Sequence, residues 1–187
     1  MDWHEVAAAL LSPTTFSAVV AISLARALDL GLREASLLAL FLVVVPLAPV
    51  LAAAKAGATD LFVSDRGVRT PLLTAAVASY LAGYAYFRRI DMWPLEFTLL
   101  AYATVTAGLV VINALHTKGS VHVAGAVGPG LTLLMLGETV GLFLLAISPV
   151  VAWVRLSGGA HDKGQVLIGG LTAATLTPAA FFLSLAL

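Results

Sequence analysis

Long apolar segments alternate with short polar segments along the whole chain. Most apolar segments are rich in Ala, Leu and Val and approach the roughly 20 residues that a helix needs to cross a membrane. Such continuous segments favour helices, since a membrane-spanning strand would alternate apolar and polar positions. The pattern predicts about six to seven spans, the fifth and sixth short enough to be tilted or partly re-entrant, near 6–28, 35–54, 72–87, 95–115, 123–136, 140–154 and 166–187.

The composition is that of a membrane protein. Of the 187 residues 60% are hydrophobic and 11% are charged, and the mean hydropathy is +1.02. Soluble domains carry about a quarter charged residues. We therefore expect an all-α, polytopic transmembrane helical bundle that forms a single domain over residues 1–187. The formal net charge of zero gives no indication of a nucleic-acid partner, and the oligomeric state stays open.

Proline and glycine predict local features of these spans. Pro46 and Pro49 predict a kink in the second span, and Pro71 predicts that the third helix begins close to residue 72. The fifth span contains glycines that would let another helix approach closely: Gly125, Gly128 and Gly130.

Three polar segments, which we call the first, second and third islands, interrupt the apolar pattern at 60–71, 116–122 and 155–165. Two predicted spans separate the first island from the second, and two more separate the second from the third. All three islands should therefore lie on the same side of the membrane. Polar and ionisable groups in such a chain are costly and usually functional.

The islands contain the groups that phosphoryl transfer requires. Arg66, Arg69 and Arg155, with Lys118 as a further cation, supply donors suited to phosphate oxygens. Gly119 and Ser120 stand at the predicted start of a helix, which is a common anion site. Two histidines, His122 and His161, can serve as nucleophile and proton donor.

In these positions the chain resembles the type-2 phosphatidic acid phosphatases, membrane lipid phosphatases related to the vanadium haloperoxidases. The family motifs read Lys-x6-Arg-Pro, Pro-Ser-Gly-His and Ser-Arg-x5-His-x3-Asp. Here the third is Arg155-x5-His161, with Val154 at the serine position and Gln165 at the aspartate position. The second is 119–122, Gly-Ser-Val-His, and the first is the irregular 66–71, Arg-Gly-Val-Arg-Thr-Pro. The resemblance covers about 60–170.

The resemblance implies a metal-independent phosphatase without cofactors that hydrolyses a lipid phosphate or a polyprenyl (di)phosphate through a phosphohistidine. His161 would be the nucleophile and His122 the general acid, and Gln165 would orient His161. The remaining island residues would bind the substrate phosphate: Arg155, Ser120, Arg66, Arg69, Lys118 and Gly119. With an amide in place of the carboxylate we expect slow catalysis, and a faster Gln165→Asp variant.

The side of the membrane is predicted differently by two criteria. The resemblance implies an extracytoplasmic active site. The positive-inside rule favours the opposite, since the island side carries six of the ten Lys and Arg residues. We give the count less weight because at least three of these cations are assigned to phosphate.

Other interpretations of the same residues exist. Gln165 at the aspartate position favours a catalytically degenerate relative that binds or moves an anionic lipid. Arg66 and Arg69 could be interfacial charges, with Asp65 pairing with Arg69 one helical turn away. A zinc site from the histidines of the islands would lack a fourth ligand and a recognised spacing: His116, His122 and His161.

Overall fold

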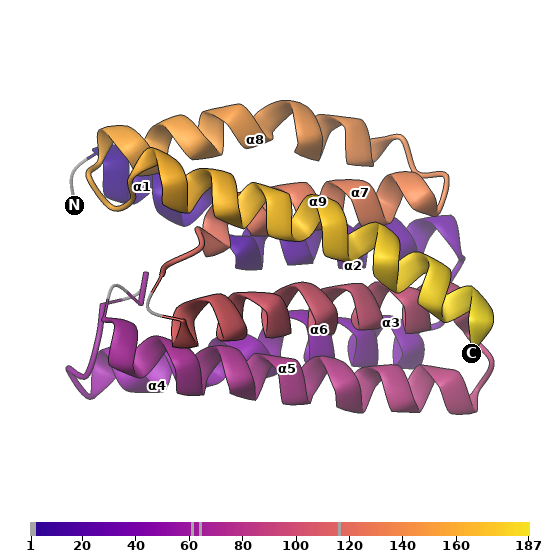
Figure 1. Cartoon of the computed structure of the whole chain (residues 1–187). Coiled ribbons are helices and arrows are strands. Elements are labelled where there is room, and N and C mark those ends of the chain that lie inside the picture. The colour runs from indigo at the N-terminus through magenta and orange to yellow at the C-terminus, as the bar shows by residue number, and fades with distance from the viewer. Residues whose placement is uncertain (1–2, 61, 64, 116) are drawn as a thin grey trace.

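The computed structural model describes residues 3–60, 62, 63, 65–115 and 117–187, without the side chain of Arg66. The regular secondary structure of this part of the chain is entirely helical, and the helices pack side by side into one bundle (Figure 1), which confirms the predicted fold class. The elements are α1 (Trp3–Leu10), α2 (Pro13–Ala27), α3 (Leu32–Ala39), the π-helix η1 (Leu40–Val44), α4 (Val45–Lys55), α5 (Arg66–Arg89), α6 (Trp93–Ala114), α7 (Val121–Met135), α8 (Val140–Ser157) and α9 (Lys163–Ala186).

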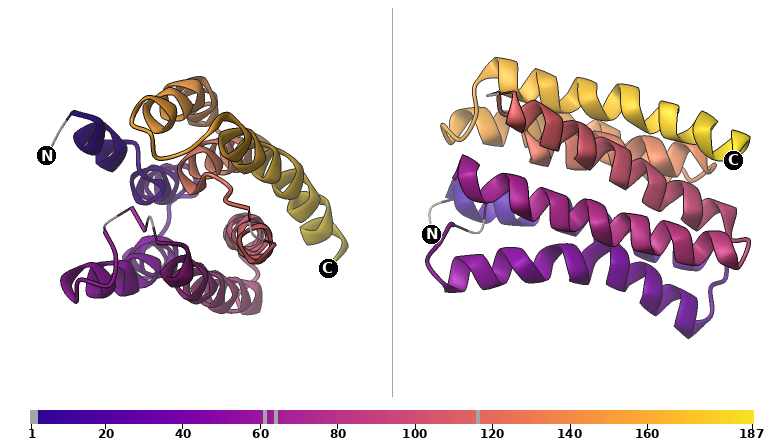
Figure 2. Two further views of the ribbon diagram at one scale, coloured as in Figure 1. Left: turned by 60° about the vertical axis from the view of Figure 1, so that its left-hand side comes forward. Right: turned by 60° about the horizontal axis from the view of Figure 1, so that its bottom comes forward.

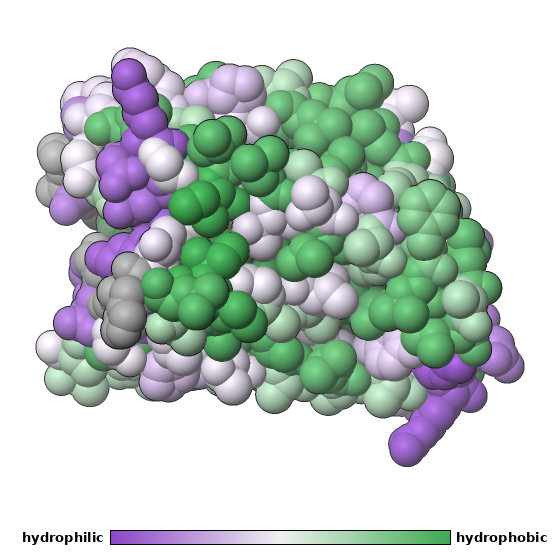
Figure 3. Space-filling model, in the orientation of Figure 1, coloured by the Kyte–Doolittle hydropathy of each residue, from purple (hydrophilic) through white to green (hydrophobic). Residues whose placement is uncertain are grey.

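The bundle has the surface of an integral membrane protein. Within the described residues, five helical stretches are long and apolar enough to cross a membrane, and the shorter apolar helix α7 accompanies them. The space-filling view shows a hydrophobic belt between hydrophilic ends (Figure 3). The five stretches are Trp3–Ala27, Leu32–Lys55, Trp93–Ala114, Val140–Ser157 and Lys163–Ala186.

The start of α5 differs from the prediction. The helix begins at Arg66, because the Asp65 side chain caps it by accepting a hydrogen bond from the Val68 N–H at 3.1 Å. Pro71 therefore lies inside the helix, and the predicted start near 72 is wrong. An aspartate N-cap satisfies an N–H that would otherwise lack a partner. The consequence is that Arg69 extends from a helix, not from a loop.

The second span contains a π-helix next to its prolines. The Val45 N–H bonds to the Leu40 carbonyl, five residues back, and Pro46 follows without an N–H. The Phe41 carbonyl, which Pro46 cannot reach, instead accepts a hydrogen bond from Ser79 Oγ of α5 at 2.8 Å. The predicted irregularity thus takes the form of a π-helix whose missing hydrogen bond is supplied by a neighbouring helix.

Close helix packing is confirmed at Gly125 and Gly130 of α7, whereas a Cβ on Gly128 would make only an ordinary contact, 3.6 Å from Thr177 Oγ1. A Cβ on Gly125 would stand 2.8 Å from the Pro13 side chain of α2, and one on Gly130 would stand 2.9 Å from Leu145 of α8. Gly141 of α8 approaches the Gly130 carbonyl so closely that a Cβ there would collide with it. These contacts hold α7 between α2 and α8.

The three islands lie at one end of the bundle. The α4–α5, α6–α7 and α8–α9 connections all gather at the end that carries α1, on the left of Figure 1, and the second view shows the same grouping (Figure 2). The α2–α3, α5–α6 and α7–α8 turns and the C-terminus lie at the opposite end. The islands therefore lie together, as the count of membrane crossings predicted.

Candidate active site

The first and second islands meet at Arg69. This side chain is only 6% exposed, and its Nη2 donates a hydrogen bond to the Gly119 carbonyl oxygen at 3.2 Å. A guanidinium carries five N–H donors, of which this bond uses one. The burial shows that Arg69 is not an exposed interfacial charge paired with Asp65.

The second and third islands meet at Ser120, which is fully buried. Its backbone N–H donates to the Gln165 carbonyl at 2.9 Å, while its Oγ caps α7 by accepting from the Val123 N–H at 3.4 Å. Gly169 of α9 allows this approach, because a Cβ there would collide with the Ser120 backbone. The start of α7 is thus fixed against the first turns of α9.

Arg155 brings a buried positive charge into the same place from the last turn of α8. The residue is 6% exposed, and among the described residues its Nε, a buried atom, has no hydrogen-bond partner. The guanidinium carbon lies 5.6 Å from the centre of the Phe62 ring, and the Asp60 carboxylate interacts with the charge. A buried guanidinium N–H without a partner is costly unless a ligand accepts from it.

His122 lies beside these arginines in the first turn of α7. It is 6% exposed, and its buried Nε2 has no hydrogen-bond partner in the described part of the chain. The ring lies 6.0 Å from that of Phe62, against the Ala8 carbonyl of α1, and interacts electrostatically with Arg155 and His161. Two islands therefore bring into one region buried nitrogens that have no partner among the described residues.

His161 is held by Gln165 one turn further along. His161 Nδ1 lies 2.9 Å from Gln165 Oε1. An amide oxygen only accepts hydrogen bonds, so Nδ1 donates, and in the neutral ring the lone pair is on Nε2. Asp162, which the sequence offered as a weak substitute for the family's aspartate, caps α9 by accepting from the Gln165 N–H at 2.8 Å.

The charge state of His161 suits a nucleophile. Burial is the main reason that its pKa falls from 6.5 to about 4; the Gln165 hydrogen bond opposes the fall, and the charges of Arg155, Arg69 and Lys118 add to it. The ring is therefore neutral at pH 7. A neutral imidazole with a lone pair on Nε2 is the form that attacks an electrophile.

The spacing of Arg155 and His161 is set by the α8–α9 turn. Gly159 adopts φ +67°, a conformation that favours glycine, and the His161 N–H returns to the Arg155 carbonyl at 3.2 Å. The five intervening residues thus form a closed turn that presents both side chains at one end of the bundle.

The other predicted site residues are placed less fully. Lys118 interacts electrostatically with His161, and Gly119 contributes the carbonyl bound by Arg69. The side chain of Arg66 and the whole of His116 lie outside the described residues. Among the residues that are described, no group of three or more His, Asp or Glu side chains could hold a metal ion.

Phe62 and Asp60 belong to the site but were not singled out from the sequence. Phe62 contacts both Arg155 and His122, and the next residue, Val63, has φ +53°, an unusual value for a β-branched side chain. An aromatic residue inside a polar island was the available signal. Its partners, however, depend on a loop conformation that the residue types do not indicate.

Comparison of the chain with protein-family models, with curated proteins and with solved structures gives no match. The resemblance to a phosphatase family therefore rests on the motif residues alone and stays a prediction.

Proposed function

We propose that this protein is an integral-membrane phosphatase of the type-2 phosphatidic acid phosphatase kind, acting through a phosphohistidine without a metal ion. The observation that carries the proposal is a pair of buried nitrogens, Arg155 Nε and His122 Nε2, which have no hydrogen-bond partner among the described residues. They lie close to His161, whose lone pair is on Nε2. A phosphate group would accept from the first two while the third attacks its phosphorus.

In the first step the substrate phosphate binds among Arg69, Arg155 and the start of α7. His161 Nε2 donates its lone pair to phosphorus, a P–N bond forms, and the P–O ester bond breaks. His122 gives a proton to the leaving oxygen. The negative charge of the bound phosphate favours the protonated ring.

In the second step a water molecule attacks the phosphohistidine. His122, now neutral, accepts a proton from that water, the P–N bond breaks, and inorganic phosphate leaves with His161 restored. Gln165 fixes the ring through Nδ1 in both steps. A neutral amide orients the ring but stabilises positive charge on it less than a carboxylate would, so turnover is slow.

The substrate in this proposal is a lipid phosphate or a polyprenyl (di)phosphate, hydrolysed at the extracytoplasmic membrane surface. Cysteines introduced at the exposed residues Ser157 and Asp91 report the orientation. Labelling of the Ser157 cysteine by an impermeant reagent in intact cells is expected, and protection of that cysteine alone would place the site in the cytoplasm.

A second function, binding or moving an anionic lipid without hydrolysis, has two observations in its favour. The Phe62 ring lies over the Arg155 guanidinium, and Gln165 replaces the family's carboxylate. A binding protein would need the cations but not the histidine pair. The two functions therefore differ in what His161 does.

Phosphate release from dodecyl phosphate in detergent with EDTA present separates them. The proposal predicts release by the wild type, loss with His161→Ala, and no change with Lys163→Ala, an exposed control at the start of α9. Retained binding of the substrate by His161→Ala would show that the variant is folded. Activity that disappears with EDTA and returns with magnesium would contradict this mechanism, and binding without release supports the lipid-binding function.

A further inference from the structure

A large cavity extends from the candidate site into the bundle. Its volume is about 670 Å³, within the roughly 300–1,000 Å³ of small-molecule sites. His122, Arg69 and Asp60 line its polar end. From there it continues between α2, the η1–α4 segment and α5 along walls that are mainly apolar, including Leu42, Val43, Leu47, Val50, Leu73 and Ala76.

The η1–α4 segment forms one wall of this space. Leu42, Val43 and Pro46 all line the cavity, so the π-helix and the proline that follows it lie directly on its surface. The Ser79 hydrogen bond to Phe41 holds this irregular segment against α5. Because π-helices occur frequently at functional sites, the one on this wall favours a functional role for the cavity.

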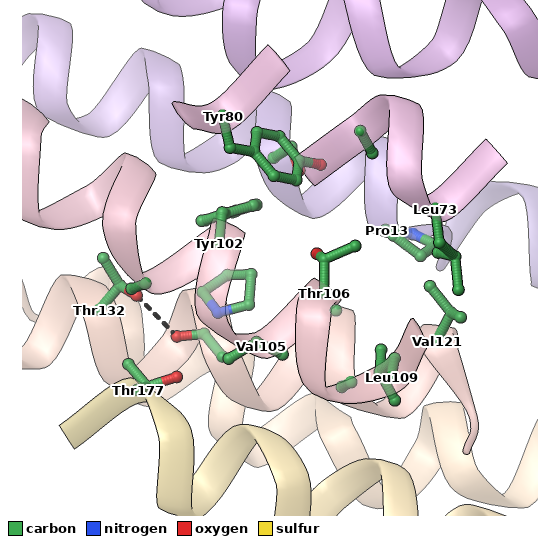
Figure 4. Close-up of a pocket in the computed structure, with 17 residues that line it drawn as sticks. Pro13, Leu73, Tyr80, Tyr102, Val105, Thr106, Leu109, Val121, Thr132 and Thr177 are labelled. Carbon is green, nitrogen blue, oxygen red and sulfur yellow. Dashed lines mark hydrogen bonds between the residues drawn. The ribbon is translucent and has the colours of Figure 1, made fainter. Parts of the chain in front are cut away.

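Among the α5 residues that line the cavity, Tyr80 lies farthest from Arg69. A smaller cavity of about 80 Å³ lies beside it, and six residues line both: Pro13, Ser17, Leu73, Ala76, Tyr80 and Val121. Figure 4 shows the smaller cavity, with Tyr80 on one side and Thr177 on the opposite side. The Tyr80 ring packs edge-on against that of Tyr102, with 5.4 Å between centres, so a neighbouring ring supports it in this position.

The two ends of the cavity call for different ligand chemistry. Arg69 and His122 at one end are buried and suit an anion, whereas the walls beyond them suit hydrocarbon. Arg69 and Tyr80 are eleven residues apart on α5, which is about 16 Å at the helical rise of roughly 1.5 Å per residue. A ligand that satisfies both ends carries a phosphate on a single hydrocarbon chain of limited length.

We propose that this cavity holds the hydrocarbon chain of the substrate and that Ala76 and Tyr80 set the length of chain it accepts. The inference rests on the proposed function for the position of the phosphate. It adds a chain subsite to the phosphate site and names two residues of α5 that determine specificity.

The test measures equilibrium binding of octyl-, dodecyl- and hexadecylphosphonate to detergent-solubilised protein. These ligands carry a phosphate-like head that cannot be hydrolysed as an ester, so binding is read without turnover. Ala76→Phe fills the cavity beside Tyr80, and Ala75→Phe is the matched control, because Ala75 is exposed on the outer face of the same helix. The ratio of variant to wild-type dissociation constants cancels partition of each ligand into detergent.

We expect Ala76→Phe to weaken hexadecylphosphonate binding roughly tenfold, as extra bulk in an apolar cavity does, while octylphosphonate binding changes less than about twofold. Tyr80→Ala joins the two cavities and should favour the longest ligand. Equal weakening at every chain length, no effect of Ala76→Phe, the same effect from Ala75→Phe, or no binding by the wild type would overturn the chain subsite.

Phosphate release from the matching alkyl phosphates, measured in parallel, separates this inference from the proposed function. Chain-dependent binding without phosphate release leaves the subsite in place and removes the phosphatase. Phosphate release with no chain-dependent effect of Ala76→Phe supports the phosphatase and removes the chain subsite.

Discussion

Replacing Gln165 by glutamate should raise the pKa of His161 and accelerate phosphate release. Glutamate has the length of glutamine, so a carboxylate oxygen can take the place of Oε1, 2.9 Å from His161 Nδ1. Aspartate, which the family resemblance suggested, is one methylene shorter and reaches the ring only if the turn shifts. The structure therefore ranks Gln165→Glu above Gln165→Asp.

The expected size of the pKa shift follows from the contact between the ring and the new carboxylate. An opposite charge in contact shifts a pKa by about 1–3 units. The pKa of His161 is about 4, so the variant should titrate between about 5 and 7. Hydrogen bonds to charged groups contribute about 1–2 kcal/mol more than neutral ones, which corresponds to roughly tenfold in rate if the bond strengthens as positive charge develops on the ring.

The assay is kcat/KM for dodecyl phosphate as a function of pH, which reports groups of the free enzyme. His161 attacks only when neutral, so activity falls as the pH drops through its pKa. The acid limb of the variant should lie at higher pH than that of the wild type, with a plateau about tenfold higher. The ratio of the two profiles cancels the titration of the substrate phosphate, which has a pKa near 6.

Lys163→Gln provides the control, because it changes the net charge by the same amount at an exposed position two residues from Gln165. It should leave the acid limb in place. A folded Gln165→Glu variant whose acid limb does not move, or which loses activity over the whole pH range, would show that Gln165 does not act on the nucleophile.

Three further variants test other parts of the structure. Gly169→Ala should lower the free energy of unfolding by about 1–3 kcal/mol and reduce phosphate release, because the new Cβ collides with the start of α7. Gly170→Ala should change neither, because a Cβ there stands 3.5 Å from its nearest neighbour. Ser79→Ala should lower the free energy of unfolding by about 1–3 kcal/mol, because the Phe41 carbonyl loses its hydrogen-bond donor. An unchanged melting temperature would contradict the role given to this hydrogen bond. Arg155→Lys should raise KM for alkyl phosphates roughly tenfold, since an ammonium cannot bind phosphate in a bidentate manner, and an unchanged KM would remove Arg155 from the site.

The sequence predicted the fold class and the grouping of the islands for simple physical reasons. Apolar segments of membrane-spanning length can bury their backbone groups only as helices, and an even number of crossings returns the chain to the same side. The contact between His161 and Gln165 was predicted for a helix that starts at His161. The structure forms the contact with His161 just before the Asp162 cap of α9. These inferences use only the spacing of residues along the chain and the number of membrane crossings.

Other features depend on competition between local signals. The Asp65 cap and Pro71 both indicate a helix start, and the cap prevailed, which placed Arg69 on a helix. The contacts of Phe62 depend on a loop in which Val63 adopts positive φ, against its residue preference. The chain cavity depends on a π-helix, which proline positions indicate only as an unspecified kink.

The most direct test of the central claim is to trap the covalent intermediate. Wild-type protein incubated briefly with dodecyl phosphate, quenched in alkali and digested, should yield a peptide that carries phosphate on His161 by mass spectrometry, and His161→Ala should yield none. Phosphate on another residue, or phosphate release by the wild type with no phosphopeptide after rapid quenching across the time course of turnover, would contradict the assignment of His161 as the nucleophile.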